Sequence, residues 1–297
     1  MKKIDLHIHT TYSDGYYSPQ DILILAKNKK LSTISITDHD TIDVYLKDNI
    51  IEKAKELELE IIPGVEISTE HNDSEIHILG YNFDIYNKKL NDVLNFIITE
   101  RVNRVKRIIK KLNSNGIDIT FEELEKLHKS TTYGRPHVAD MMIRKGYIKN
   151  IYEAFTYHIG INCYAYEKKI HISPKIAIDI IHEAGGIAIM AHPNKTNEEI
   201  LNYLINSGID GFEIIHPSHT NSIKNNLKKL VDYYFLLETG GSDFHGGNKN
   251  DNENLGNYFI SETVYENLLK YQLKWWDIYE TIWRKISSKK LKICYSC

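Results

Sequence analysis

The sequence predicts an α/β fold, a distorted (β/α)7 TIM-like barrel that carries a helical insertion. The first observation is that short apolar runs alternate with longer amphipathic segments along the chain. Strands that alternate with helices are typical of a parallel sheet, which is either open or closed into a barrel. The second observation is that seven apolar runs have the pattern of strands, which favours a distorted barrel with one unit fewer than the usual eight.

The expected elements keep this alternation. The expected strands are residues 4–10, 33–37, 61–68, 75–83, 186–192, 211–216 and 235–242. The expected helices are residues 19–30, 41–59, 90–115, 174–184, 198–206 and 222–234. Ser18 and Pro19 indicate the start of the first helix, because serine caps a helix N-terminus and proline fits the first turn.

The alternation breaks at about residues 100–170, which we interpret as a helical insertion over one end of the barrel. Residues 101–112 are strongly helical and basic, and residues 121–128 and 138–145 favour further short helices. The predicted division places the barrel in residues 1–100 and 170–260, the insertion lobe in 101–169 and a helical extension in 261–297.

The extension is basic and aromatic. It carries Trp275, Trp276 and Trp283, which are expected to pack a terminal helix against the barrel. A surface for nucleic acid or for another partner is the alternative, because aromatic rings beside basic residues can stack on bases.

The composition indicates a soluble globular protein. Apolar residues make up 42% of the 297 residues and charged residues 26%, which disfavours disorder, collagen and coiled coil. Three cysteines are too few for a secreted disulfide scaffold. Polar residues interrupt any signal peptide at the N-terminus, and no apolar run reaches the roughly 20 residues that span a bilayer. We therefore expect a cytoplasmic location without membrane contact.

The 14 histidines carry the functional argument. All seven predicted strands contain or lead into a histidine or a carboxylate, mostly near the C-terminal end, where α/β barrels build their active sites. Such groups are costly to bury unless they are paired, hydrogen-bonded or coordinated. Mixtures of histidine and carboxylate suit Zn, Mn, Fe or Co, so the sequence predicts a site for two or three divalent cations.

Six motifs occur in order between residue 2 and about residue 256: DLHIHTTYSDG, ITDHDT, PGVEIS, EIHILGY, GGIAIMAHP and GSDFHG. Together they resemble the motifs of the PHP (polymerase and histidinol phosphatase) family of metal-dependent phosphoesterases. The resemblance implies a trinuclear metal site in a seven-unit barrel, with Mn, Fe or Zn as the expected ions.

The resemblance also implies a role for each candidate ligand. It assigns His7, His9, Glu66 and Asp243 to the first metal ion, Asp14, His39 and His245 to the second, and His77 and His192 to a third that Glu66 bridges. Taken by itself, His77 has an alternative to metal binding, which is a hydrogen bond to a backbone carbonyl. Asp5, Asp38 and Asp40 are expected to orient ligand imidazoles, and capping of the next helix is the alternative for Asp40.

The YGRPHVA stretch of the insertion resembles the branch that includes nucleoside 3′,5′-bisphosphate phosphatases and 5′–3′ exoribonucleases. This resemblance implies that Arg135 binds substrate phosphate, for which a planar guanidinium is well suited. A surface arginine without that role is the alternative. His137 is expected to face the same pocket and bind substrate, or to cap a helix.

One stretch departs from this branch. Members of the branch often have a Gly-Lys-Pro-Ala-Tyr-Val-like run after the insertion, and this chain has GINCYA at residues 160–165, without the lysine. A phosphate contact is therefore either lost or moved to Lys168 or Lys169.

The expected reaction is hydrolysis of a phosphate ester by a hydroxide that bridges two metal ions. Glu66 is expected to fix the spacing of the ions as a bridging carboxylate. His216 is a candidate to contact the phosphoryl group or to protonate the leaving oxygen, and a hydrogen-bonded structural residue is the alternative. His219 is a further candidate for substrate binding.

The expected substrates are a nucleoside 3′,5′-bisphosphate or a 5′-phosphorylated RNA end. The alternatives are a phosphatase for histidinol phosphate or another small sugar phosphate, a non-catalytic metal-stabilised binding module, and a barrel that hydrolyses C–N bonds. The complete ligand set and the GRPH stretch favour the nucleotide phosphoesterase.

Overall fold

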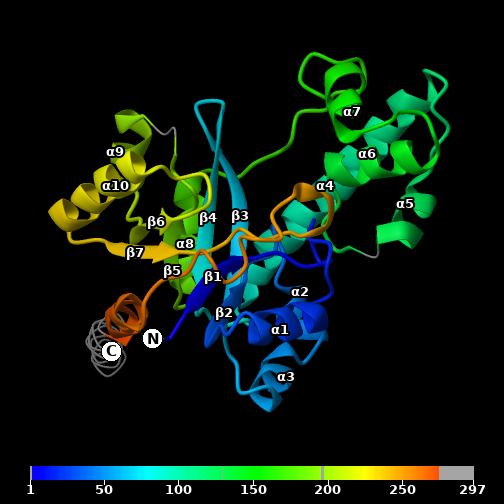
Figure 1. The fold of residues 1–297 in the computed structure, drawn as a ribbon. Coiled ribbons are helices and arrows are strands. Elements are labelled where there is room, and N and C mark those ends of the chain that lie inside the picture. The colour runs from blue at the N-terminus through cyan, green and yellow to red at the C-terminus, as the bar shows by residue number, and fades with distance from the viewer. Residues whose placement is uncertain (1, 129, 195–196, 274–297) are drawn as a thin grey trace, which may run out of the picture.

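A computed structural model describes residues 2–128, 130–194 and 197–273, and a seven-stranded sheet forms its centre (Figure 1). The strands are β1 (Ile4–Ile8), β2 (Thr33–Ile36), β3 (Glu60–His71), β4 (Ser74–Tyr81), β5 (Ile187–Met190), β6 (Gly211–Ile215) and β7 (Leu237–Gly240). They lie in the sheet in the order of the chain. Each predicted strand is present, with ends that differ by a few residues.

The prediction of a wholly parallel sheet is wrong at β4. This strand pairs antiparallel with both β3 and β5, whereas the other neighbouring pairs are parallel. The reason is the two-residue connection between β3 and β4, Asn72 and Asp73, whose φ angles are 50° and 57°. Two left-handed residues form the tight turn of a hairpin, so β4 must run back along β3.

The sheet is not closed by a continuous ladder. Beyond the end of β7, an isolated parallel bridge joins Ile8 to Phe244, and the amide of His9 donates to the Phe244 carbonyl at 2.9 Å. The α/β fold around a mostly parallel seven-stranded sheet is therefore confirmed, and the closed barrel is not.

Helices flank the sheet (Figure 1). They are α1 (Pro19–Asn28), α2 (Asp43–Lys47), α3 (Ile50–Glu56), α8 (Pro174–Glu183), α9 (Glu198–Asn206) and α10 (Asn221–Tyr234). Ser18 caps α1 through the amide of Asp21, as the sequence predicts. The single helix expected at residues 41–59 is two helices, because Asn49 has a left-handed backbone with φ 48°.

One long helix, α4 (Lys88–Asn113), connects the sheet to a helical lobe that stands to one side of it in Figure 1. Leu90, Leu94 and Ile97 pack into the main core, whereas Ile108 and Leu112 pack into a separate core. The helical lobe consists of the second half of α4 with α5 (Phe121–His128), α6 (Arg135–Arg144) and α7 (Ile151–Tyr157). The sequence did not predict α7.

The described part of the C-terminal extension contributes to the fold. Tyr265 and Leu268 are buried in a cluster with Leu6, Leu79 and Ile189 of the sheet. Trp275, Trp276 and Trp283 lie outside the described residues, so the packing expected of them stays a prediction. Within the described residues, no helix combines the length and the apolar character needed to cross a membrane.

Gly64 provides a test of how closely β2 and β3 approach beside the site. A Cβ atom at Gly64 would overlap Ser35 Oγ and lie 2.8 Å from Thr37 Cγ2. We expect Gly64→Ala to lower the free energy of unfolding by roughly 1–3 kcal/mol, the usual effect of overpacking. Gly134→Ala is the matched control, because its Cβ would have 3.4 Å to the nearest atom. Urea unfolding measures both, and equal stability of the two variants would contradict the account.

Candidate metal centre

Nine side chains meet at the end of the sheet where the parallel strands finish. They are the nine residues to which the family resemblance assigns metal binding. His7 and His9 come from β1 and the residue after it, His39 follows β2, Glu66 and His77 lie in β3 and β4, His192 follows β5, Asp243 and His245 follow β7, and Asp14 comes from the loop between β1 and α1.

Glu66 is the centre of this arrangement and is 1% exposed. Its Oε2 lies 3.3 Å from His7 Nε2, 3.2 Å from His9 Nε2 and 3.1 Å from His39 Nδ1. Its Oε1 lies 2.7 Å from His77 Nδ1 and 3.0 Å from His192 Nε2. One carboxylate therefore contacts five imidazoles.

The ligand atoms form three overlapping groups in which all atoms lie within 4.8 Å of one another. The groups are His7, His9, Glu66 and Asp243; His9, Asp14, His39 and His245; and His39, Glu66 and His77. The first matches the predicted first set, and the second contains the predicted second set together with His9. His192, assigned to the third ion, contacts the same Glu66 oxygen as His77.

The donor atoms suit divalent cations. Asp14 Oδ1 and His245 Nε2 lie 3.3 Å apart, and each is buried without a hydrogen-bond partner. Buried polar atoms are nearly always satisfied, so such a pair of atoms calls for a further partner. Imidazole with carboxylate is a donor set for Zn, Mn, Fe or Co, although the number and identity of the ions stay a prediction.

The charges of the cluster are mutually dependent. Burial opposes protonation of His9 and of His77. Glu66 and Asp243 outweigh burial at His9, and Glu66 and Glu75 outweigh it at His77, so the pKa of each histidine is raised to about 9. Burial also opposes ionisation of Glu66 and Asp243, yet the surrounding histidines lower the pKa of each carboxyl group well below its usual value. Cations bound among these groups would take the place of the protons, so their binding releases protons.

Glu213 is a functional residue that sequence reasoning missed. It is fully buried in β6; its Oε1 lies 3.0 Å from His7 Nδ1, and its Oε2 accepts from the His192 amide at 2.8 Å. A carboxylate on the far nitrogen of an imidazole fixes the ring and makes it a better ligand. The available signal was a glutamate inside an otherwise apolar strand, which is costly to bury without a partner.

The three aspartates expected to orient imidazoles bond to other groups. Asp5 accepts from the amides of His7 and Ser242. Asp38 accepts from the amide and hydroxyl of Thr10 and from the hydroxyl of Ser13. These carboxylates hold the backbone that carries the ligands.

Asp40 accepts from the Ser68 amide at 2.7 Å and from Arg101 Nε at 2.6 Å. The alternative of Asp40 as a helix cap is wrong, because Ile42 occupies the N-cap position of α2. The Asp40 ion pair instead ties α4 to the loop that carries His39.

The backbone at several of these positions is in the left-handed region. The φ angle is 58° at Asp40, 30° at His192 and 47° at Asp243. Such values are uncommon for residues with a side chain and concentrate at functional sites, where they direct a side chain that a regular strand would point elsewhere.

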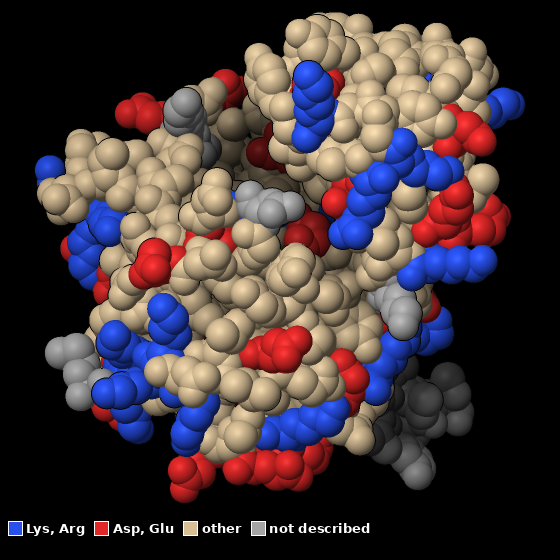
Figure 2. Space-filling model, turned by 45° about the vertical axis from the view of Figure 1, so that its right-hand side comes forward, with Lys and Arg blue, Asp and Glu red and all other residues tan. Residues whose placement is uncertain are grey.

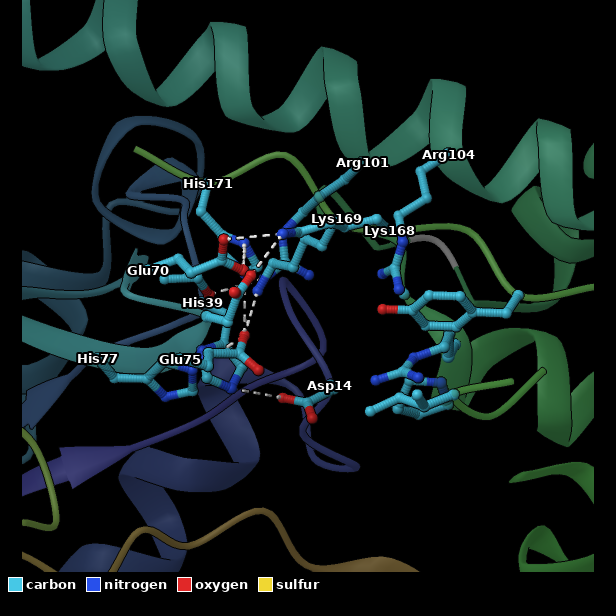
Figure 3. A pocket seen from close by; sticks show the side chains of 17 residues that line it. Asp14, His39, Glu70, Glu75, His77, Arg101, Arg104, Lys168, Lys169 and His171 are labelled. Carbon is cyan, nitrogen blue, oxygen red and sulfur yellow. Dashed lines mark hydrogen bonds and ion pairs between the residues drawn. The ribbon is translucent and has the colours of Figure 1, made fainter. Parts of the chain in front are cut away.

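A pocket of about 310 Å³ opens beside the cluster. Asp14, His39 and His77 line it together with a set of cationic residues, Arg101, Arg104, Arg135, Lys168 and Lys169. Figure 3 shows Arg101 and Arg104 reaching toward the pocket from α4, with His39 and His77 across from Arg104. In Figure 2 the surface is hollowed between the helical lobe and the rest of the molecule, with acidic side chains inside the hollow.

The cationic residues of the pocket are held in different ways. The Arg135 guanidinium lies 5.2 Å from the Phe155 ring and 5.8 Å from the Tyr166 ring, which position it by cation–π contacts. Lys169 Nζ pairs with Glu75 at 2.8 Å, and Lys168 Nζ pairs with Asp73 at 3.0 Å. Both lysines therefore line the pocket. Each is in a position to replace the lysine that is missing after Gly160.

The three histidines expected to bind substrate occupy different places. His216 Nε2 lies 3.3 Å from Asp243 Oδ2, at the edge of the cluster, and His216 Nδ1 accepts from the Ser218 amide. His219 is buried, and its Nδ1 bonds to the Ile214 carbonyl. His137 is buried in α6 and bonds to backbone at both ring nitrogens. Substrate contacts by His216 and His219 stay predictions. The alternative for His137, capping of a helix, is present, because its Nδ1 accepts from the amide of Gly134, the N-cap residue of α6.

Comparison with known proteins places the site in a family. The family described as PHP domain matches residues 5–184. The chain is 34% identical to a 5′-3′ exoribonuclease of Haemophilus influenzae over 82% of this chain and 90% of that protein. It is 26% identical to a 3′,5′-nucleoside bisphosphate phosphatase of Chromobacterium violaceum over 82% of this chain and 88% of that protein.

A solved structure agrees with these relatives. A Bifidobacterium adolescentis protein assigned as a metal-dependent phosphoesterase superposes with a TM-score of 0.81 and 27% identity. The alignment covers 90% of this chain and 96% of that chain.

Glu213 gives a test of the cluster that does not depend on turnover. We expect Glu213→Gln to weaken Mn²⁺ binding about 10–100-fold, because an amide no longer makes His7 a strong ligand. Glu198→Gln, at the exposed start of α9, is the matched control. Calorimetric titration of metal-free protein measures both, and unchanged affinity in Glu213→Gln would remove its assigned role.

Proposed function

Because the chain belongs to the PHP domain family, we propose that it hydrolyses phosphate esters of nucleotides, with 5′-phosphorylated RNA ends and nucleoside 3′,5′-bisphosphates as its substrates. The protein is a metal-dependent phosphoesterase. The observation that carries the proposal is the pocket in which the cluster around Glu66 adjoins arginines and lysines. Both substrates present two phosphate groups, one to be cleaved and one to be held.

The assignment of ligands follows the geometry. Three divalent cations are proposed, held by the groups around Asp243, around Asp14 and His245, and around His77 and His192, with Glu66 shared. When bound, they would supply a nucleophilic hydroxide from water and neutralise charge on the phosphoryl oxygens. Mn, Fe and Zn all fit these donors.

The side chains of the pocket then have separate tasks. Arg135 binds the phosphate that is not cleaved, because contacts with two aromatic rings keep the planar donors of its guanidinium directed at one place. His216 donates a proton to the leaving oxygen through Nε2, since its Nδ1 accepts from Ser218 and leaves Nε2 to carry the proton. Lys169, which lines the same pocket, supports the negative charge of the substrate.

Of the two proposed activities, 5′–3′ exoribonuclease activity on RNA is favoured over phosphatase activity on the bisphosphate. The Haemophilus influenzae relative with that name is 34% identical, against 26% for the bisphosphate phosphatase. A small sugar phosphate with one phosphate group would give Arg135, for which no carboxylate partner is present among the described residues that line the pocket, no second phosphate to bind, which disfavours that alternative.

The substrate assignment is tested by product analysis. We expect Mn²⁺-loaded protein to release mononucleotides stepwise from a 5′-phosphorylated RNA oligomer and phosphate from a nucleoside 3′,5′-bisphosphate. Asp243→Ala and excess chelator should abolish both reactions, because each removes the cations from the site. Chromatography of the products follows the reaction. Silence on both substrates with Mn²⁺ bound would contradict the proposal, and a sugar phosphate series would then be the next assay.

Substitution of Arg135 is expected to affect substrate binding and not the rate of the hydrolytic step. We expect Arg135→Met to raise KM for either nucleotide about tenfold or more while kcat changes little, because a charge-assisted hydrogen bond to phosphate contributes mainly to binding. Arg144→Met, at the exposed end of the same helix, is the control. Steady-state kinetics with the bisphosphate decide the matter, and an unchanged KM in Arg135→Met would show that the phosphate lies elsewhere.

A further inference from the structure

His137 has no ring nitrogen left for a substrate. It is 7% exposed and lies in the first turn of α6. The Gly134 amide donates to its Nδ1 at 3.1 Å, so Nδ1 accepts and Nε2 carries the proton. Nε2 therefore donates to the Ser13 carbonyl, at 3.1 Å, from a residue 124 positions away in the chain.

Neighbouring residues of the helical lobe also donate hydrogen bonds to the loop that contains Ser13. Ser130 Oγ donates to the Ser13 carbonyl at 2.9 Å. The amides of Thr131 and Thr132 donate to the Tyr12 carbonyl at 3.1 and 3.3 Å. On its other side, the Ser13 hydroxyl donates to Asp38 at 2.5 Å. The carbonyls of Tyr12 and Ser13 are thus held from the lobe, and the Ser13 side chain is held from the sheet.

Asp14 is the next residue and contributes to the cluster. Its Oδ1 is buried without a hydrogen bond and faces His245 Nε2 at 3.3 Å and His39 Nε2 at 4.0 Å. His39 and His245 follow strand ends, whereas Asp14 stands in a loop directly before Gly15. Lys249 Nζ donates to the other carboxylate oxygen of Asp14, Oδ2, at 2.8 Å and holds the side chain, so the backbone of the loop is what remains to be held by other groups.

We propose that His137 is a positioning residue for Asp14, through which the helical lobe completes the cation group of His9, Asp14, His39 and His245. The imidazole bonds to the backbone beside the ligand and touches neither substrate nor cation. Burial and the nearby His128 lower the pKa of His137 to about 4, which keeps the ring neutral.

The same turn of helix also carries the phosphate contact assigned above. Arg135 lines the cationic side of the pocket, and Pro136 separates it from His137. If the proposed function holds, the group that binds the retained phosphate and the group that places Asp14 belong to one rigid turn. A change in His137 is then expected to act on cation binding, whereas a change in Arg135 acts on phosphate binding.

The test is a calorimetric titration of metal-free protein with Mn²⁺ alone, in His137→Phe and in Ser130→Ala. We expect one class of Mn²⁺ site to weaken about tenfold or more in His137→Phe, as is usual when a group that supports a ligand is lost. Ser130→Ala should weaken the same class to a smaller extent. Arg144→Ala, at the other end of α6, should bind Mn²⁺ as the wild type does.

Kinetics distinguish positioning from substrate contact. In His137→Phe we expect kcat to fall at limiting Mn²⁺ and to recover in excess Mn²⁺, with KM for the bisphosphate unchanged. A raised KM that excess Mn²⁺ does not correct would make His137 a substrate contact and overturn the inference. Unchanged Mn²⁺ affinity in both variants would overturn it as well.

The two proposals fail separately. If the wild type cleaves neither nucleotide, the proposed function fails, and the Mn²⁺ titration still decides the role of His137. If thermal unfolding shows that His137→Phe does not fold, the Ser130→Ala titration decides, and an unchanged affinity there contradicts the inference.

Discussion

The buried carboxylate of Glu66 is the constraint on which the rest of this structure depends. A group that is 1% exposed and contacts five imidazoles is stable only if the charges around it are balanced. Protons on the histidines provide that balance in part, and the proposed cations would complete it. The strand ends, the left-handed residues after them and the supporting Glu213 all serve to bring donors to this one group.

The helical lobe takes part in the site in two ways. Its arginines line the pocket next to the cluster, and its loop before α6 holds the backbone that carries Asp14. Helix α4 packs into the cores of both sheet and lobe, and the ion pair between Arg101 and Asp40 joins it to the loop of His39. In the proposed function, cation binding and substrate recognition therefore depend on the same part of the molecule.

Short-range patterns in the sequence were enough to predict the strands and the residues that follow them. Short apolar runs between amphipathic segments located the seven strands, and the histidines and carboxylates after the parallel strands came together because parallel strands finish at one edge. The Asn72–Asp73 turn is a signal in the sequence for the antiparallel β4, and the apolar neighbours of Glu213 are a signal that this carboxylate has a buried partner. The bond between His137 and Ser13 was not predictable, because it joins residues 124 positions apart in separate lobes. Closure of the sheet depends on backbone pairing beyond β7, which the pattern of side chains does not specify.

The most direct measurement of the central claim is anomalous scattering from crystals of the Mn²⁺-loaded protein. The account predicts peaks on both sides of Glu66, with each of its carboxylate oxygens bound to an ion and Asp14 bound to the ion next to His245. A single peak away from Glu66, or a Glu66 carboxylate bonded only to histidines while Mn²⁺ lies elsewhere, would contradict it.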